Sequence, residues 1–365
     1  MSTPESRLDR LRAFNSSVRN ADPDLREESA DLKEVREVGV SPESVRRAIE
    51  QESIVMRRQR PVLAIRDDSP VLAFRDAADS EIWQGRLEKA GPLLVDAAKA
   101  TGRIELAGGR LDWVGTGWLV KPTVIVTNRH VAIEFAERNG QGFRFRMGSS
   151  GEMAASIDFK EEIDVETELT FNLVRPLHIE PTPGPDVAFF EVEISSGDYR
   201  LAKPIALAQA PRATENVATI GYPAYDSRIR EPELMEEIYG RVYNKKRLAP
   251  GAVTRVDDKL VWHNCTTLGG CSGSAVLDLD SGQALGLHFS GSFLESNYAV
   301  RSDVVSAILS NLGRPAPRPD PAPRPRENRS SGTAVAVHPP TPRRTTQSGQ
   351  HQTTLTVPLQ ITVSV

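Results

Sequence analysis

The chain has 365 residues, of which 26% are charged, and a formal net charge of -4. This balance predicts no general attraction to nucleic acid or to an anionic membrane. The chain has only two cysteines, whereas secreted proteins of this size usually carry disulfides. This favours a reducing compartment. The opening MSTPESRLDRLRAF lacks the apolar core of a signal peptide, and no segment approaches the roughly 20 apolar residues that span a bilayer. We therefore expect a soluble, cytoplasmic protein.

Residues 1–102 are predicted to form an α-rich extension that also contains a hairpin. The segment SPESVRRAIEQES begins with good helix-capping residues. The near-repeats PVLAIRD (61–67) and PVLAFRD (70–76) flank a polar turn and predict a β-hairpin. We interpret it as an arm packed on the main domain, and a propeptide or docking arm is the alternative. EIWQGRLEKAGPLLVDAAKATG predicts a helix that is interrupted at its Gly-Pro pair.

Residues 103–313 contain many short strand-like segments separated by Gly, Pro and Asp. Such spacing predicts an all-β barrel or sandwich rather than βαβ units. RSDVVSAILSNLG closes this region as an amphipathic helix. The strand-like segments are WVGTGWLV, TVIVTN, GFRFRMG, DVAFFEVE, VATIGYPA, KLVWHNC, SAVLDL and QALGLHFSG.

The C-terminal part is predicted to be a disordered tail that ends in a strand-like segment. Residues 314–350 are rich in Pro and Arg and read as a flexible linker. Residues 351–365 include TTLTVPLQITVSV, in which apolar and polar residues alternate. A strand with one apolar face must pair with its own sheet, with another copy of the chain, or with the sheet edge of a protein partner.

Two residues at strand ends could form a general-base pair. His130 ends the strand-like segment VIVTNRHVA, where a base is held rigidly. Asp186 precedes the apolar strand of PGPDVAFFEV and could orient a histidine by accepting its Nδ1–H. The remaining histidines that we interpret as ordinary or as part of the tail are His178, His263, His338 and His351.

The segment TLGGCSGSAV offers three candidate nucleophiles, namely Cys271, Ser272 and Ser274. Its glycines allow a tight turn that points backbone N–H groups at a developing oxyanion. The chain order of His130, Asp186 and then this segment is the order of a chymotrypsin-like triad, and differs from subtilisins and α/β-hydrolases. The residues alone leave the choice of nucleophile open.

The motifs GTGWLV, VIVTNRHVA, DVAFFEV, GGCSGSAV and ALGLHFSG, in this order, resemble the chymotrypsin-like (trypsin-fold) serine peptidases over residues 103–313. The likeness is greatest to the disulfide-free bacterial branch that includes glutamyl endopeptidases and HtrA-type proteases. It implies a mostly β fold with two packed antiparallel barrels of the chymotrypsin type. It also implies peptide-bond hydrolysis through an acyl-enzyme, with no cofactor and no metal.

The same resemblance selects the nucleophile. The family pattern Gly-x-Ser-Gly-Ser matches GCSGS at 270–274 and makes Ser272 the nucleophile, while the N–H groups of Gly270 and Ser272 form the oxyanion hole. Related enzymes with a nucleophilic cysteine have Gly directly after it, whereas Cys271 is followed by Ser272. Ser274 comes two residues late and is expected to pack inside the second barrel.

The resemblance also places the specificity pocket along GLHFSG. His288 stands where glutamyl endopeptidases use a histidine to meet a substrate carboxylate, and Thr267 could add a hydroxyl donor, which implies Glu or Asp at P1. Alternatively, His288 fills the barrel and hydrogen-bonds locally. The backbone of Phe289, Ser290 and Gly291 is expected to pair with the substrate as an antiparallel strand.

Two classes of function follow. The leading hypothesis is a bacterial, intracellular serine endopeptidase that cuts a dedicated partner protein, as in conflict or defence systems. The alternative is a non-catalytic or partner-activated binding module that presents its C-terminal strand. Intact triad candidates argue against a degenerate enzyme. We expect no PDZ-like domain after residue 313, so an HtrA-like protease-chaperone is not favoured.

Overall fold

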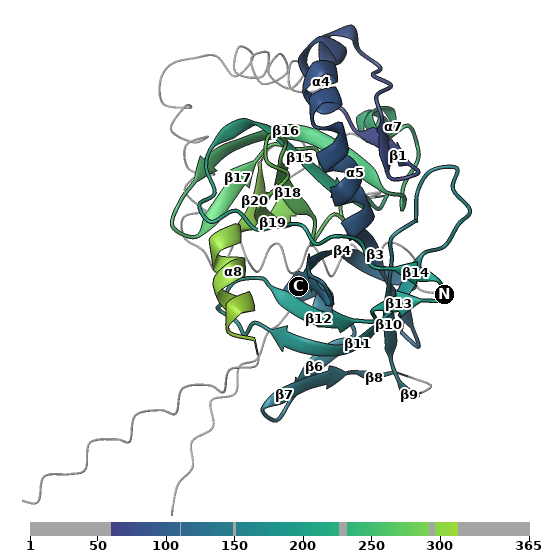
Figure 1. Ribbon diagram of the computed structural model, residues 1–365, viewed down its shortest axis with the longest axis vertical. Helices are drawn as coiled ribbons and strands as arrows, with labels where there is room; N and C mark the ends of the chain where they lie inside the picture. Colours follow the sequence, from purple (N-terminus) through teal and green to yellow (C-terminus); the bar gives the residue numbers. More distant parts are fainter. Residues whose placement is uncertain (1–59, 110, 149–150, 226–231, 292–295, 313–365) are drawn as a thin grey trace, which may run out of the picture. The chain divides into compact units, whose positions relative to one another are not determined.

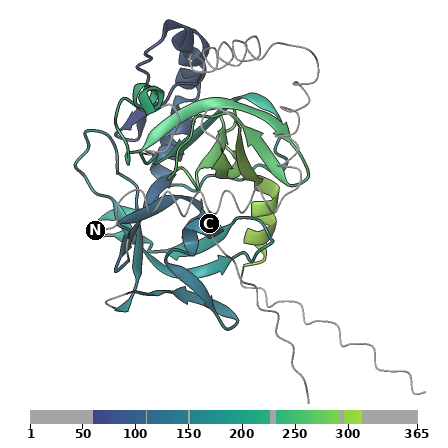
Figure 2. The same ribbon diagram turned by 180° about the vertical axis from the view of Figure 1, so that it is seen from behind.

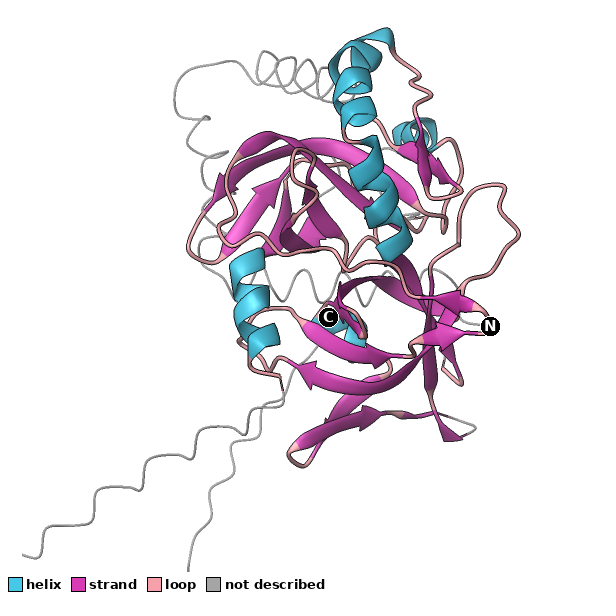
Figure 3. Ribbon diagram, in the orientation of Figure 1, coloured by secondary structure: helices cyan, strands magenta, loops and turns pink. Residues whose placement is uncertain are grey.

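The computed structural model describes residues 60–109, 111–148, 151–225, 232–291 and 296–312. Most of their regular structure is β-strand (Figure 3). The helices are α4 (Ala77–Lys89), α5 (Gly91–Ala100), α6 (Arg129–Ala132), α7 (Pro232–Tyr239) and α8 (Ser302–Ser310). The strands before residue 201 are β1 (Leu63–Arg66), β2 (Ser69–Val71), β3 (Thr101–Ala107), β4 (Trp113–Lys121), β5 (Val124–Thr127), β6 (Ala136–Asn139), β7 (Gly142–Phe145), β8 (Met147–Gly148), β9 (Gly151–Glu152), β10 (Ala154–Asp158), β11 (Thr170–Ile179), β12 (Ala188–Val192), β13 (Ser195–Ser196) and β14 (Tyr199–Arg200). The later strands are β15 (Thr214–Gly221), β16 (Arg247–Val256), β17 (Leu260–His263), β18 (Ala275–Asp278), β19 (Ala284–Gly291) and β20 (Asn297–Arg301).

The strands form two antiparallel barrels, which can be followed by their labels in Figure 1 and from behind in Figure 2. The first barrel closes in the order β10-β11-β12-β5-β4-β3. The second runs β15-β18-β19-β20-β17-β16, and the pairing of β15 with β16 completes the ring. One hydrophobic cluster includes side chains from both barrels, among them Trp118 and Leu287. The predicted mostly β, two-barrel fold is confirmed.

Each strand-like segment singled out in the sequence contains a strand, and the predicted closing helix is α8. Strands β3, β10, β11, β16 and β20 were not among those predictions. Pro250 and Gly251 interrupt the apolar pattern of β16. The structure tolerates them because β1 pairs with β16 up to Leu248 and β17 pairs with it from Val253 onward, so Pro250 has a strand partner on one side, in β15.

The predicted hairpin and interrupted helix are also confirmed. Strands β1 and β2 are joined by Asp67 and Asp68, both with positive φ, and α4 gives way to α5 at Ala90. Because β1 pairs with β16, the hairpin extends the sheet of the second barrel. The rest of the predicted extension, including SPESVRRAIEQES, and the predicted linker and tail lie outside the described residues.

A buried ion pair ties the N-terminal segment to both barrels. Lys246, at the entrance to β16, donates from Nζ to Glu162 Oε1 at 3.1 Å, and both side chains are fully buried. The same ammonium donates to the carbonyl oxygens of Ala98 in α5 and Phe159 after β10. The backbone N–H of Asp68, in the hairpin turn, donates to the other oxygen of Glu162 at 3.1 Å. Hairpin, helix and barrels therefore meet at one satisfied charge pair.

No helix among the described residues is both long and apolar enough to cross a membrane.

Candidate active site

Strand pairing in the first barrel brings His130 and Asp186 together. Strand β5 runs into the short helix α6 that carries His130, and Asp186 lies just before β12. The two strands are antiparallel neighbours, with Thr127 opposite Ala188. The end of one strand therefore lies beside the start of the other, and residues distant in sequence share one edge of the barrel.

The carboxylate of Asp186 holds His130 at two points. Its Oδ2 lies 2.6 Å from His130 Nδ1, and its Oδ1 accepts the backbone N–H of His130 at 3.0 Å. The side chains are 5% and 2% exposed, so water does not compete for either contact. Asn128 Nδ2 donates to the Asp186 carbonyl oxygen at 2.9 Å. This arrangement fixes the ring orientation and keeps Nδ1 toward the carboxylate.

Ser272 lies in a turn of the second barrel that rests on β4 of the first. Thr116 N–H donates to the Ser272 carbonyl oxygen at 2.9 Å, and Thr116 Oγ1 donates to the Gly270 carbonyl oxygen at 2.8 Å. A Cβ built on Gly115 would lie 2.9 Å from a methyl of Val131, the neighbour of His130, and 3.1 Å from the Ser272 carbonyl oxygen. The turn and the histidine segment therefore meet across β4.

Two glycines of the turn have conformations that other residues rarely adopt. Gly270 has φ +92 and Gly273 has φ +94. A Cβ on Gly273 would lie 1.9 Å from the Thr116 carbonyl oxygen, and one on Gly270 would lie 2.3 Å from the Tyr222 carbonyl oxygen. Both positions need glycine because the backbone of the turn touches the carbonyl groups of Thr116 and Tyr222 directly.

The other two nucleophile candidates have unsuitable surroundings. Cys271 is buried, and burial raises the pKa of its thiol to about 12, which disfavours the reactive thiolate. Ser274 is fully buried with its Oγ against Gly221 of β15, in the second barrel. Neither side chain is placed to attack a substrate.

His288, predicted as a specificity residue, pairs with a second histidine. Its Nδ1 lies 3.1 Å from Nε2 of His263, and both rings are buried. Burial first, and the charge of His130 second, lower the pKa of His288 to about 3. Burial, followed by the charges of His288 and Arg60, also lowers the pKa of His263 well below its usual range. Both imidazoles are therefore neutral near pH 7.

Thr267 and Gly291 meet at a residue that the sequence did not indicate. Thr267 Oγ1 donates to Asn297 Oδ1 at 2.9 Å, and Asn297 Nδ2 donates to the Cys265 carbonyl oxygen at 2.6 Å. A Cβ on Gly291 would lie 1.7 Å from Asn297 Oδ1. Asn297 opens β20 directly across from Gly291 on β19, a pairing that only the strand register reveals.

Residues Phe289, Ser290 and Gly291 form the end of β19. The pairing of β19 with β18 stops at Leu287, opposite Ala275, whereas pairing with β20 continues to Gly291. Beyond the β18 pairing, one backbone edge of this segment has no strand neighbour among the described strands.

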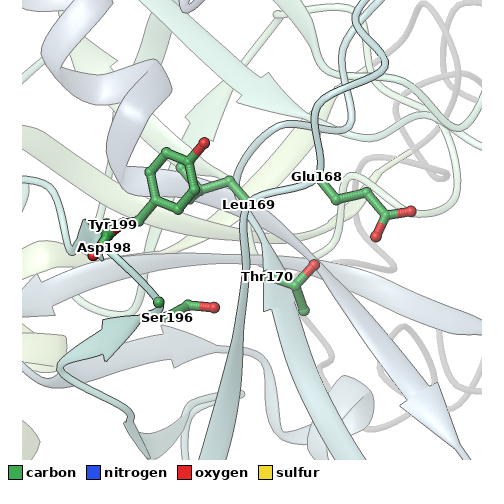
Figure 4. A pocket seen from close by; sticks show the side chains of 7 residues that line it. Glu168, Leu169, Thr170, Ser196, Asp198 and Tyr199 are labelled. Atoms are coloured by element: carbon green, nitrogen blue, oxygen red, sulfur yellow. The ribbon is translucent and has the colours of Figure 1, made fainter.

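A pocket of about 450 Å³ lies elsewhere (Figure 4). It is lined by residues before and within the start of β11 and by the β13–β14 hairpin, and it includes none of the predicted site residues. Within the described part of the chain, no group of three or more His, Cys, Asp or Glu residues is arranged to hold a metal ion. His178, which we interpreted as an ordinary histidine, has a local partner: its Nε2 lies 2.6 Å from Oε2 of Glu180.

Much of the sequence that forms the two barrels matches a known protein family. Residues 115–287 match the model of the trypsin-like peptidase domain. The match begins in β4 and ends in β19, so it includes strands of both barrels but neither β3 nor β20. The chain therefore contains a trypsin-like peptidase domain and is a chymotrypsin-like serine endopeptidase.

Similar solved structures include Deg5, the Rv3671c protease from M. tuberculosis in its active form, and a Glu endopeptidase. Their sequence identities to this chain are 16%, 17% and 19%, and their TM-scores are 0.42, 0.40 and 0.40. The alignments cover 62%, 63% and 59% of this chain, and 95%, 88% and 89% of the other chains. No curated protein sequence is significantly similar to this one.

Because the turn packs closely on β4, an added methyl group at Gly273 should destabilise the fold more than one at an open glycine. Gly273→Ala should lower the free energy of unfolding by about 2–5 kcal/mol, because it adds strain at positive φ and a contact with the Thr116 carbonyl. Gly140→Ala is the matched control, since Gly140 also has positive φ (+60) but open space around it. Its loss should be about 1 kcal/mol. Urea denaturation measures both, and equal losses would contradict the docked turn.

Proposed function

We propose that this endopeptidase works through a triad of His130, Asp186 and Ser272. The observation that carries the proposal is the buried contact of 2.6 Å between His130 Nδ1 and Asp186 Oδ2. A carboxylate so placed selects the tautomer with the proton on Nδ1 and leaves Nε2 as the base. Ser272 supports the assignment because its turn contacts β4 beside Val131.

The acylation step follows from these positions. Ser272 Oγ forms a bond to the scissile carbonyl carbon while His130 Nε2 takes the hydroxyl proton. The tetrahedral intermediate carries an oxyanion, and the imidazolium is stabilised by Asp186. His130 then gives its proton to the leaving amine as the C–N bond breaks, which produces the acyl-enzyme and the first product.

The backbone of the turn is proposed to stabilise the oxyanion. Cys271 N–H donates to the Leu268 carbonyl and Gly273 N–H donates to the His288 carbonyl. The N–H groups of Gly270 and Ser272, on either side of Cys271, take part in none of the backbone hydrogen bonds between described residues, so they can serve the substrate oxygen. In deacylation, the oxygen of water bonds to the acyl carbon while His130 takes a proton from it, and His130 returns this proton to Ser272 Oγ as the ester bond breaks and the acid product leaves.

We further propose that the enzyme prefers Glu or Asp at P1. His288 follows the β18–β19 pairing and its carbonyl accepts the N–H of Gly273, so it lies next to the nucleophile turn. His263 holds the ring through Nδ1, and the ring also hydrogen-bonds to the backbone of Tyr298, so it is fixed beside the turn, where it could meet a substrate carboxylate. Thr267 instead donates to Asn297, so its hydroxyl is a weaker candidate for a substrate contact than the sequence suggests.

The substrate strand is proposed to pair with Phe289, Ser290 and Gly291. The support is the backbone edge of β19 that extends past β18. A dedicated protein substrate, a partner bound through residues 351–365 and a cytoplasmic location in a bacterial defence system are proposals that rest on the sequence pattern alone.

The triad assignment predicts the loss of activity in two variants. Purified protein is incubated with a peptide library that varies P1, and cleavage is followed by mass spectrometry. Ser272→Ala should abolish cleavage, and Asp186→Asn should lower kcat by about 10⁴-fold because the wrong tautomer of His130 becomes favoured. Ser274→Ala, which removes the neighbouring hydroxyl, should retain activity. Equal cleavage by wild type and Ser272→Ala would overturn the triad, and no cleavage by wild type would favour the binding-module alternative.

The His288 assignment predicts a change in specificity and a dependence on pH. His288→Val should lower kcat/KM for a Glu P1 peptide about 10- to 100-fold and leave the Gln P1 peptide nearly unchanged. Because the pKa of His288 is about 3 in the free enzyme, a bound carboxylate raises it and favours proton uptake. The preference of wild type for Glu over Gln should therefore increase as the pH falls from about 8 to about 5.5. At lower pH the substrate Glu itself becomes protonated, since its pKa is about 4.3. A Glu/Gln ratio that His288→Val does not change would contradict this assignment.

A further inference from the structure

The residue before His130 binds the loop before Asp186. Arg129 Nη1 lies 2.7 Å from the Gly184 carbonyl oxygen and 3.0 Å from that of Pro185. Two further carbonyl oxygens lie at longer distances, that of Pro181 at 3.2 Å and that of Glu180 at 3.4 Å. One guanidinium nitrogen thus faces carbonyl oxygens from both ends of the loop.

The composition of the loop explains why it needs such a donor. Its sequence, EPTPGP over 180–185, contains three prolines, which have no backbone N–H. Within the loop, Gly184 N–H donates to the Pro181 carbonyl oxygen at 2.8 Å. The loop has more acceptors than donors, and buried or half-buried carbonyls require a partner. Arg129 Nη1 carries two N–H groups, and their charge strengthens the hydrogen bonds to these carbonyl oxygens.

This contact bears directly on the catalytic carboxylate, because Pro185 is bonded to Asp186. Asp186 must approach His130 Nδ1 to 2.6 Å and also accept its backbone N–H. Consecutive residues therefore hold the two sides of the contact: Asn128 binds the Asp186 carbonyl, Arg129 binds the loop before it, and His130 binds the carboxylate.

We propose that Arg129 is a positioning residue for catalysis, which acts by holding the 180–185 loop so that Asp186 stays in register with His130. Arg129 is proposed to touch neither the substrate nor a reacting atom. The inference rests on the proposed triad, and it adds to that triad a residue whose removal should change the behaviour of His130 without removing any group of the triad.

The pH dependence of the reaction distinguishes a positioning role for Arg129 from a purely electrostatic role and from a purely structural one. Among the described residues, the groups that act on His130 include Asp186, through its hydrogen bonds, and His288 on β19, whose pKa of about 3 keeps it neutral in the range tested. If Asp186 shifts away, the protonated imidazole of the reaction loses the carboxylate that stabilises it, and the acid-side midpoint of the rate profile should move to lower pH. If Arg129 acted only as a nearby positive charge, its removal would have the opposite effect. A loss of stability alone would not move the profile.

The test uses a fluorophosphonate probe on the full-length protein, so that it does not depend on an identified substrate. Ser272 Oγ forms a bond to phosphorus, fluoride leaves, and the hydroxyl proton passes to His130. The second-order rate constant of labelling is measured from pH 5 to pH 9, at about half-unit steps, from the time constant rather than the amplitude. An unfolded fraction then lowers the amplitude and does not distort the rate.

Arg129→Gln should lower this rate constant about 10- to 100-fold at pH 7.5, and it should move the acid-side midpoint of the profile to lower pH. Arg129→Lys should recover part of the rate and part of the shift, because it keeps the charge and some donors. Arg175→Gln is the control, since Arg175 is an exposed arginine of the same barrel that pairs with Glu191. It should match wild type.

An unchanged rate in Arg129→Gln, or a midpoint that stays in place or moves to higher pH, would overturn the positioning role. Failure of the proposed triad would give a different result: wild type would not react with the probe, or Ser272→Ala would react equally well. That result is obtained before any Arg129 variant is used, and it would overturn both proposals.

Discussion

The site depends on one contact between two barrels that close separately. The turn over 270–273 belongs to the second barrel, yet it rests on Thr116 of β4, which donates from its backbone and from its hydroxyl. Gly273 has no side chain at the closest point, where its backbone faces the Thr116 carbonyl. If this contact were lost, Ser272 would separate from the edge of the first barrel that carries His130. The geometry of the proposed nucleophile is therefore a consequence of barrel docking, and the turn by itself does not determine it.

Burial then decides what each polar group at this junction can do. Asp186 and His130 are shielded from water and instead form a close, oriented contact with each other. For His263 and His288, which have no carboxylate among the partners described here, burial instead keeps the rings neutral. A preference for acidic P1 residues would thus rely on an N–H donor and on proton uptake when substrate binds, because no permanent positive charge is present on these rings near pH 7.

Much of the fold could be predicted because local patterns agreed with the final structure. Apolar segments bounded by Gly, Pro and Asp became strands, and the Gly-Pro pair interrupted the helix before β3. The missed strand β16 shows the limit of this reasoning. Pro250 and Gly251 argue against a strand unless one knows that neighbouring strands pair with other parts of β16.

The site followed the same division between local and long-range information. His130, Asp186 and Ser272 lie in recognisable local motifs, whereas His263 and Asn297 became relevant only through the pairing of β17 and β19 with β20. Arg129 also looked unremarkable in the sequence, since nothing local indicates that it binds a loop 50 residues or more away along the chain. Strand register, which depends on the whole sheet, supplied what the sequence pattern lacked.

We propose that barrel docking makes Ser272, and not a neighbouring side chain, the nucleophile. The most direct measurement is the mass-spectrometric mapping of the adduct formed with phenylmethanesulfonyl fluoride. We expect one sulfonyl group per chain on Ser272, and we expect it to be lost when His130→Ala removes the base. An adduct on Cys271 or Ser274, or one on Ser272 that persists without His130, would contradict it.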